Sequence, residues 1–459
     1  MPTPLIFQGF ACKMENGKNG GSQSDGWGTA NSAQTLGAGD GIPYLTLETN
    51  PDFSFKGDDS ITSNAFMSSS RIMGKALSKP LSFLDRYYGQ DKLNYWMFGF
   101  ENDPQAVVVF SASDTPWSTA EPAPGTVFVD VTTTEFTYLR REAIRDMDNL
   151  VSYVYIFSNV GLVLPDITSG VITEQGDTPT FTFTAHSTQF YEHLYELDKL
   201  GRRIRDYTTA EQAVTGWQAG DVKNIMMTMG RRLDSYDQRL KNAMCKSWNW
   251  KLAAADSATI EAGFIAYDRI RGDYASDTWS LPTGLEDIFS SPPSHETQFF
   301  LGTIFEGGSR DMVSLGMAES NITCEIPLDE TQSYTSGVWF DTPILNAKYT
   351  LAMNGTINRH DAATYEELMD NNTYVCAQVI SNMGYYMKEF LIKRATITKS
   401  GPDASPVAQE PLDLSIGYVP LASSPFTAAG HMYGNTEIQD SPIIMRVRNE
   451  SAVNQMFAN

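Results

Sequence analysis

Three closely spaced glycines, Gly37, Gly39 and Gly41, are the first residues whose spacing could serve a ligand. Glycine loops bind dinucleotides when they read G-x-G-x-x-G and open a helix, because the helix N-terminus then carries the phosphates. Here the spacing is G-x-G-x-G, and the next residues alternate apolar and polar as a strand does. No G-x-x-x-x-G-K-[ST] loop occurs either. We therefore interpret this stretch as the approach to a β-strand and predict no cofactor site there.

The histidines offer few metal ligands. His186 and His193 are seven residues apart and flank Glu192, a step that would align them on one helix, but His186 falls in a strand pattern. Solvated surface histidines are the preferred interpretation. The five are His186, His193, His295, His360 and His431.

A paired carboxylate, Gly57-Asp58-Asp59, resembles the magnesium-binding aspartates of polymerases, but those need a partner aspartate in a basic cleft. A polar turn between strands is the preferred interpretation. No G-x-S-x-G elbow and no serine or cysteine in a nucleophile motif is present. We predict no catalytic residue, no metal site, no cofactor and no enzymatic activity.

The cysteines lie far apart and form no C-x-x-C pair, so we expect isolated thiols that pack as small apolar groups. They are Cys12, Cys245, Cys324 and Cys376. The N-terminus lacks a basic segment followed by a long apolar run, and about 18 consecutive apolar residues occur nowhere. We expect neither a signal peptide nor a membrane span, which makes the sequons at Asn321, Asn354 and Asn449 chance matches.

The composition indicates a folded protein with an acidic surface. The chain has 459 residues, 41% of them hydrophobic and 12% aromatic, enough for a large core. Its formal net charge of -22 repels phosphate backbones and anionic lipids, so tight nucleic-acid binding is unfavourable. This charge is compatible with a protein wall along which DNA passes without binding.

Most of the secondary-structure elements that the sequence predicts, and that would position any site, are strands. Alternating or β-branched segments predict strands within 42–57, 105–113, 125–139, 178–187, 311–329, 336–359, 389–398 and 411–423. Apolar residues spaced by three and four predict helices at 139–154, 188–206 and 220–240. A short helix follows Asp361 as its N-cap. Residues 243–270 predict a hairpin turning near Ala255–Ser257, with a helical alanine run as the alternative.

These patterns divide the chain into five segments. We predict a flexible arm at 1–39, a first β block at 40–138, a helix-containing middle or insertion at 139–242, a second β block at 243–424 and a C-terminal arm at 425–459. The arms follow from glycine-rich or polar composition without a period.

The order of these segments resembles the major tail tube proteins of long non-contractile-tailed phages. An aromatic-Gly-Thr step in an N-terminal arm and an acidic "GD"-led first strand are matched here by Trp27, Gly28, Thr29, Gly39, Asp40, Ile42 and Glu48. Residues 309–370 resemble the family's later β unit, a strand pair before a short helix. The chain is longer than the usual subunit, and the middle segment has no counterpart in the minimal fold.

The resemblance implies a mainly β subunit, a β-sandwich or half-barrel that closes into a barrel in a hexameric ring, with helical insertions. It implies stacking of rings into a tail tube that conducts DNA, with the chain itself, the tape measure protein, the tail terminator and distal tail proteins as partners. The expected location is the virion tail, assembled in the host cytoplasm without a membrane. The alternatives are another virion protein, such as a capsid or minor tail subunit, and a soluble enzyme or carbohydrate-binding β protein.

Overall fold

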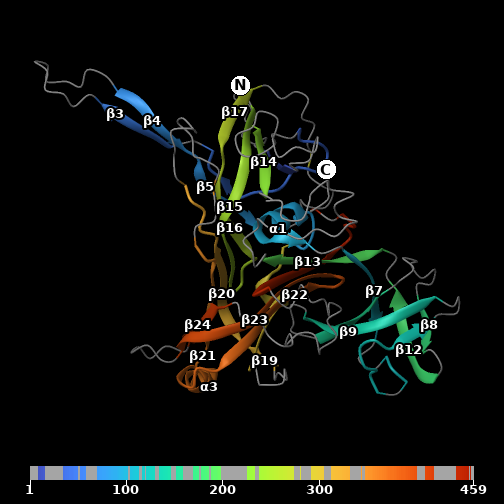
Figure 1. The fold of residues 1–459 in the computed structure, drawn as a ribbon. Helices are drawn as coiled ribbons and strands as arrows, with labels where there is room; N and C mark the ends of the chain where they lie inside the picture. Colours follow the sequence, from blue (N-terminus) through green and yellow to red (C-terminus); the bar gives the residue numbers. More distant parts are fainter. Residues whose placement is uncertain are drawn as a thin grey trace, which may run out of the picture.

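The protein is mainly β, as predicted. The computed structural model describes residues 9–15, 35–49, 52–57, 70–101, 104–112, 116–118, 120–129, 134–145, 151–158, 169–174, 177–185, 188–197, 225–232, 237–272, 280, 291–303, 312–330, 343, 347–400, 409–417, 441–453 and 455. Within these ranges strands dominate and two α-helices occur (Figure 1).

Two sets of strands repeat one topology. The first repeat comprises β1 (Phe10–Glu15), β2 (Thr46–Leu47), β3 (Asp52–Gly57), β4 (Ser70–Ala76), β5 (Ser78–Leu84), α1 (Asp91–Phe98), β14 (Met226–Arg232), β15 (Asp237–Ala253), β16 (Thr259–Ile265) and β17 (Asp268–Gly272). The second comprises β18 (Thr297–Thr303), after the 3-10 turn η3 (Ser294–Glu296), then β19 (Met312–Leu315), β20 (Met317–Glu325), β21 (Thr350–Asn358), α3 (Arg359–Asp370), β22 (Tyr374–Met383), β23 (Tyr386–Ser400), β24 (Gln409–Ile416) and β25 (Ile443–Asn449).

Six antiparallel pairings recur in the same order. In the first repeat they are β1–β14, β14–β15, β15–β17, β15–β16, β16–β5 and β5–β2. In the second they are β18–β22, β22–β23, β23–β25, β23–β24, β24–β21 and β21–β20. Each repeat therefore centres on one long strand, β15 or β23, whose first half pairs with β17 or β25 and whose second half pairs on the same side with β16 or β24.

Both long strands also carry bulges at matching places. The pairing of β15 shifts between Ala243 and Leu240 against β14, and again between Cys245 and Ser247 against β16. The pairing of β23 shifts between Ala395 and Ile392 against β22, and between Ile397 and Lys399 against β24. A bulge fixes the register of a strand and bends it. The matching bulge positions on β15 and β23 therefore define which residues of the two repeats are equivalent.

In this alignment, a buried apolar residue of one repeat corresponds to a buried apolar residue of the other, as expected if the two repeats build their cores in the same way. Pairs of equivalent residues in the main core are Phe10 and Phe299, Leu77 and Leu351, Met227 and Val375, Leu240 and Ile392, Cys245 and Ile397, and Phe264 and Leu414. The repeats are joined edge to edge, because the second half of β15 also pairs with β20, the first strand of the second repeat's β20–β21 pair.

A smaller lobe, strands β7–β12, is inserted between α1 and β14 and lies at one side of the molecule (Figure 1). The inserted strands are β6 (Gly99–Glu101), β7 (Gln105–Ala112), β8 (Val127–Val129), β9 (Glu135–Arg145), β10 (Val151–Ser158), β11 (Ser169–Glu174), β12 (Asp177–Ala185) and β13 (Phe190–Leu197). The pairings run β7–β10–β9–β8–β11–β12 and return from β12 to β7.

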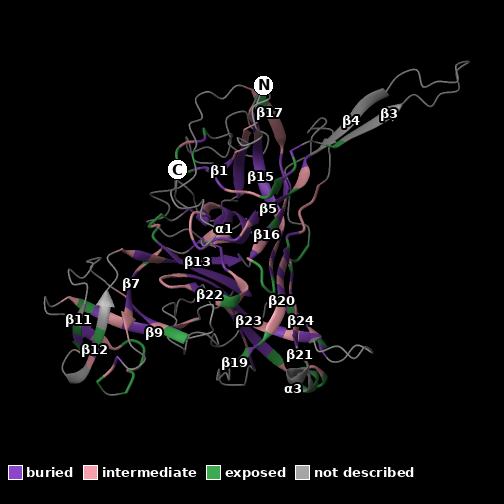
Figure 2. Cartoon of the chain, turned by 180° about the vertical axis from the view of Figure 1, so that it is seen from behind, coloured by how far each residue is buried: buried purple, intermediate pink, exposed green. Residues whose placement is uncertain are grey.

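The strands β7 and β10 are buried on both faces at their centres, and Figure 2 shows β7 largely buried. On β7, Val108 and Phe110 enter an aromatic cluster with Phe181, while Val107 and Val109 pack on the opposite face against Phe190. Ring centroids of Phe110 and Phe181 are 5.8 Å apart. This alternation between two cores explains why apolar residues follow one another so closely in this segment.

The helices predicted at 139–154, 188–206 and 220–240 are wrong. These segments contain the strands β9 and β10, β13, and β14 with the start of β15, respectively. Because these strands carry buried apolar residues on both faces, such residues occur at three- and four-residue spacing as well as at two, and the pattern then resembles a helical period. Residues 146–150, 198–206, 220–224 and 233–236 of these predictions lie outside the described residues.

Other predictions have mixed outcomes. The hairpin turning near Ala255 is confirmed, and the helical alternative is wrong, since β15 and β16 pair across it. The short helix is confirmed as α3, but it begins at Arg359, so Asp361 lies in its first turn and not at its N-cap. The four predicted block boundaries stay predictions.

Strands also occur within both predicted terminal arms. β1 pairs with β14, and all seven residues of β25 are buried. For Phe10–Glu15 and Ile443–Asn449 the expectation of an arm is therefore wrong, because these strands complete the two repeats. The main sheet is not closed into a barrel.

Candidate functional site

The main sheet ends in open edges, the first features that could serve a function. Among the described strands, β2 has β5 as its one partner. On the side of β23 that faces β22, pairing stops at Tyr374 and Thr396, and no described strand continues along Ile397–Ser400. Backbone N–H and C=O groups along such edges are templates for another strand.

A second feature is the β3–β4 hairpin, which projects away from the body (Figure 1). Among the described strands its members pair only with each other, from Asp52 opposite Ala76 to Gly57 opposite Ser70. An isolated two-stranded hairpin is marginally stable in water. It gains stability when another surface covers it.

The glycine-rich stretch forms a tight turn held against β1. Gly39 has φ +80°, and the Gly37 N–H donates to Asp40 Oδ2 at 2.7 Å. The Cys12 N–H donates to the Asp40 carbonyl at 2.9 Å, and Lys92 of α1 forms an ion pair with the Asp40 carboxylate. The segment with the three glycines thus leads into β2, as the sequence predicted. Trp27, Gly28 and Thr29 lie outside the described residues.

The most concentrated group of charges is a buried network that ties the lobe to the second repeat. Its members come from β9, β13, β23 and β25, and their charges balance. They are Arg140, Glu142, Glu192, Glu389, Arg446 and Arg448. The Arg448 guanidinium contacts Glu142 at 2.7 Å and Glu192 at 3.2 Å. The network thus ties β9 to β13, β23 and β25, strands with which β9 has no described backbone pairing.

The network fixes the charge of its carboxylates. Burial alone would raise the pKa of Glu142, but the Arg448 and Arg140 guanidinium groups hold it well below its usual range. Burial raises the pKa of Glu389, and Arg446, at 2.5 Å, offsets this only in part. Removing one partner would leave a buried charge uncompensated, so the network is a structural tie.

His193 forms a second buried group, which holds the segment after β25. Its Nδ1 lies 2.7 Å from Glu101 Oε1 and its Nε2 lies 2.7 Å from the Ser451 carbonyl oxygen. The Gln455 N–H donates to Glu101 Oε2 at 2.6 Å, and Asn449 Nδ2 donates to Asp91 at 2.9 Å. Because the Ser451 carbonyl can only accept, Nε2 carries a proton.

Charge explains the titration of this group. Burial alone would lower the pKa of His193, but Asp91 and Glu101 raise it to about 9. Burial raises the pKa of Glu101 to about 7 despite the bond from His193. For His193 the prediction of a solvated surface histidine is wrong, because its neighbours satisfy both ring nitrogens inside the protein.

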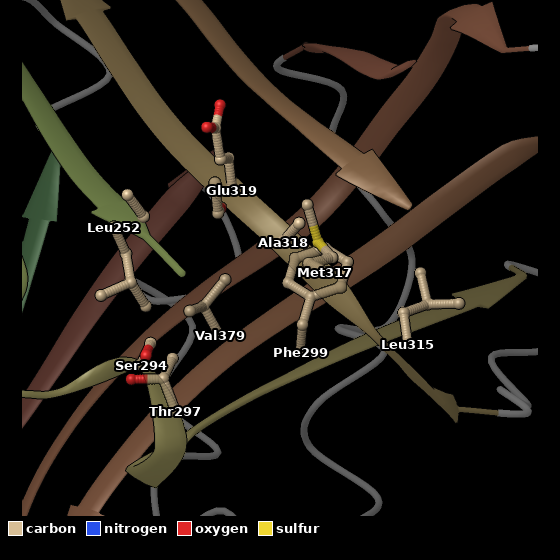
Figure 3. Close-up of a pocket in the computed structure, with 11 residues that line it drawn as sticks. Leu252, Ser294, Thr297, Phe299, Leu315, Met317, Ala318, Glu319 and Val379 are labelled. Atoms are coloured by element: carbon tan, nitrogen blue, oxygen red, sulfur yellow. The ribbon is translucent and has the colours of Figure 1, made fainter. Parts of the chain in front are cut away.

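The described part of the chain was compared with two kinds of site, a cluster of metal ligands and a ligand pocket. Within the described ranges, no three His, Cys, Asp or Glu side chains lie together as metal ligands would. A cavity of about 50 Å³ lies where β15, β18, β19, β20 and β22 meet, lined by Leu252, Phe299, Met317 and Val379 (Figure 3). It has room for a few waters, whereas ligand pockets measure about 300–1,000 Å³.

The remaining predicted residues are dispersed. All four cysteines are free and buried, as expected of packed thiols. Gly57 ends β3, while Asp58 and Asp59 lie outside the described residues, as do His186 and His431. His295 is in η3 and His360 in α3. Asn321 and Asn354 face each other across β20–β21. Asn449 is buried.

Sequence reasoning missed both buried charge groups. A signal was available in β25, where Arg446 and Arg448 alternate with apolar residues in the run Ile443–Arg448. Charged residues are rarely buried unless paired, so arginines in a strand with that pattern indicate buried carboxylates elsewhere.

No protein-family model matches this chain, and no curated protein matches its sequence. No helix in the described part of the chain is long and apolar enough to cross a membrane.

Proposed function

We propose that this chain is a structural virion protein that assembles with copies of itself into stacked rings forming a phage tail tube. The observation that carries the proposal is the open main sheet, which already joins two like repeats edge to edge and has further edges with no strand partner among the described strands. Closing a ring pairs the edges that one chain leaves open. Stacked rings would also give the β3–β4 hairpin a surface to cover it.

The proposed tube is a conduit for DNA. The net charge of -22 favours a wall that DNA passes without binding. On this proposal the partners are other copies of the chain, the tape measure protein, the tail terminator and distal tail proteins, in the virion tail after assembly in the host cytoplasm. A reconstruction with a channel lined mainly by lysine and arginine would contradict the conduit role.

Negative-stain microscopy of the purified full chain at rising concentration tests the proposal. We expect tubes with a central channel. Closed shells would instead favour a capsid protein, and lasting single chains would contradict assembly.

A matched pair of variants sharpens the test. Leu45, beside β2, is 52% exposed, and Val171, on the lobe strand β11, is 45% exposed. Leu45→Asp places a charge at the open edge and should abolish tubes, whereas Val171→Asp should leave them intact. Equal effects would contradict assembly through this edge.

A further inference from the structure

Eight of the described strands form one continuous sheet that runs through both repeats. In pairing order they are β2, β5, β16, β15, β20, β21, β24 and the second half of β23. The joint between the repeats is the pairing of β15 with β20, which continues for seven residue pairs without a shift in register. A feature that both repeats carry on the same face of this sheet therefore extends across the whole sheet.

One face of the sheet belongs to the main core. A row of paired residues crosses six of the strands on this face, and every member is a buried apolar residue. The row is Leu47, Leu81, Ala262, Trp248, Cys324 and Leu351, each opposite the next in the pairing. Because successive side chains of a strand point to opposite faces, the residues on either side of this row lie on the other face.

The neighbouring row crosses all eight strands on the opposite face, and its side chains are small and polar. It begins at Thr46, passes through Glu261, Asn249 and Thr323 near the joint, and ends at Ser415 and Thr396. None of its eight residues is buried, and all but Ala352 carry a hydroxyl, amide or carboxyl group. We call this row the polar row and the face that contains it the polar face.

Acids outnumber bases among the charged side chains that these eight paired strands place on the polar face. The acids are Glu261, Glu319, Glu325 and Asp413, and the bases are Lys251 and Lys399. Lys251 contacts Glu261 at 2.6 Å, and Lys399 lies opposite Asp413 in the pairing of β23 with β24. Glu319 and Glu325, at the two ends of the joint, are exposed and add negative charge to the face.

This composition does not fit a surface that holds a partner. The centres of protein interfaces are apolar and rich in aromatic residues, and DNA-binding surfaces are basic. The polar row has neither property. Its hydroxyl, amide and carboxyl groups bind water, and the surplus of negative charge repels phosphate groups. The polar face is therefore suited to the passage of an anionic polymer across a layer of water.

We propose that the polar face lines the channel of the tube and is the surface that DNA passes. This inference rests on the proposed function and deepens it, because it names the surface that faces the DNA. The polar row spans the sheet from Thr46 to Thr396, so a closed ring of chains carries it around the channel. Helix α3 lies on the core side of the sheet, because Tyr365 belongs to the main core and Leu368 packs against it. Its exposed acids therefore face away from the channel.

The accessibility of single thiols in assembled tubes tests the channel assignment. The native cysteines are buried, so Asn354→Cys, two residues beyond Ala352 on β21, adds an exposed thiol on the polar face, and Glu366→Cys adds one on α3. N-ethylmaleimide is small enough to diffuse along the channel and should modify both variants. Maleimide-coated gold particles wider than the channel should bind along the whole length of Glu366→Cys tubes. On Asn354→Cys tubes they should bind only at the ends, with at least about tenfold fewer particles per tube length.

An exchange of charge tests the contribution of the acids. Glu319→Lys with Glu325→Lys places two lysines on the polar face, and Glu366→Lys with Glu367→Lys makes the same change in net charge on α3. Tubes of each variant are mixed with a short DNA duplex at low salt and then treated with a nuclease coupled to beads too wide for the channel. We expect the first variant to protect at least about tenfold more DNA than wild-type tubes. The second should protect no more than the wild type, because its lysines bind DNA on the outside, where the nuclease reaches it.

The outcomes separate this inference from the proposed function. Gold along the sides of Asn354→Cys tubes, or resistance of that thiol to N-ethylmaleimide, would overturn the channel assignment and leave tube formation standing. Equal protection of DNA by the two lysine variants would overturn it as well. Glu319→Cys, on the same face, is the second reporter if Asn354→Cys does not assemble. Wild-type chains that stay single at high concentration would overturn the proposed function and this inference with it.

Discussion

The two repeats share a topology but differ in which edges they leave covered. In the first repeat the second half of β15 is flanked by β16 and β20, while β17 has β15 as its one partner among the described strands. In the second repeat the end of β23 has no described strand on the side of β22, but β25 is covered by β13 of the inserted segment. One fold thus produces an internal joint in one half and an available edge in the other.

The difference shows how a duplicated sheet avoids unlimited pairing. An edge such as β25 would be a template for strand addition, and β13 together with the charge network occupies it. The edges that remain are then few and specific. Asp85, after β5, ties the halves further, because it pairs with Lys388 of β23 and accepts a hydrogen bond from Trp250 Nε1 at 2.8 Å.

The largest expected effect comes from removing an arginine in the covered edge. Arg448→Ala removes the guanidinium that contacts both Glu142 and Glu192, leaves these two buried carboxylates with Arg140 as their shared contact, and should destabilise the protein by about 3–5 kcal/mol. The matched change on the equivalent strand, Arg271→Ala, alters an exposed residue and should stay within about 0.5 kcal/mol. Denaturant unfolding followed by fluorescence measures both.

Similar midpoint shifts for the two variants would contradict the contrast between the strands. Arg448→Lys sharpens it, because a lysine keeps the charge but cannot contact two carboxylates with a planar fork. We expect an intermediate loss.

The next effect concerns a carboxylate at the first repeat's bulge. Asn242 has φ 55°, and its N–H and Nδ2 donate to Glu15 at 2.9 and 2.6 Å, while Thr228 donates at 2.7 Å. Burial raises the pKa of Glu15 to about 7, although the bonds from Asn242 and Thr228 lower it. The equivalent bulge in the second repeat has Arg394 in place of Asn242.

This raised pKa makes stability depend on pH. The folded protein holds the Glu15 proton at pH values where the unfolded chain, with the ordinary value of 4.5, has lost it. The stabilisation is therefore complete below pH 4.5 and is lost as the pH rises through about 7, by about 3 kcal/mol at 1.36 kcal/mol per pH unit.

Glu15→Gln removes this titration. From pH 5 to 8 we expect the wild-type protein to lose stability relative to the variant, as measured by urea midpoints at each pH. Glu261→Gln, at an exposed position on β16, is the control and should run parallel to the wild type. A constant difference between Glu15→Gln and the wild type would contradict the assignment.

The sequence predicted the fold class and many strands because their patterns are local. β7, β12 and β20 have the β-branched or alternating runs that one strand shows by itself. β9 and β10 were misassigned because each packs against two cores, which no local window reveals. The duplication was not visible either, since it lies in the pairings and the bulge positions and not in residue identity.

The candidate site was predictable only in its glycine turn. Gly37–Asp40 forms a local turn, so its strand-leading role follows from neighbouring residues. The charge network joins Glu142 to Arg448, 306 positions along the chain, and such partners follow from topology alone. The open edges are likewise a property of the pairing order.

The smallest effect tests the turn of the β15–β16 hairpin, beside the joint between β15 and β20. Ala255 has φ 59°, a left-handed conformation that costs an L-residue roughly 1–2 kcal/mol, while its N–H donates to Ser294 Oγ at 2.9 Å. Ala255→Gly removes the strain and keeps the bond. Because glycine also gives the unfolded chain more freedom, we expect a net gain of about 0.5–1 kcal/mol in thermal or urea unfolding.

Ala254→Gly is the matched control, since Ala254 is not among the described residues with positive φ. Glycine there adds only unfolded-state freedom and should destabilise slightly. A gain in stability for Ala255→Gly together with a loss for Ala254→Gly would locate the strain at Ala255. A loss of stability for both variants would mean that the turn has another conformation. This turn lies at the end of β15 that pairs with β20. Relieving its strain should therefore stabilise the β15–β20 pairing, while the edge at the end of β23 stays unchanged.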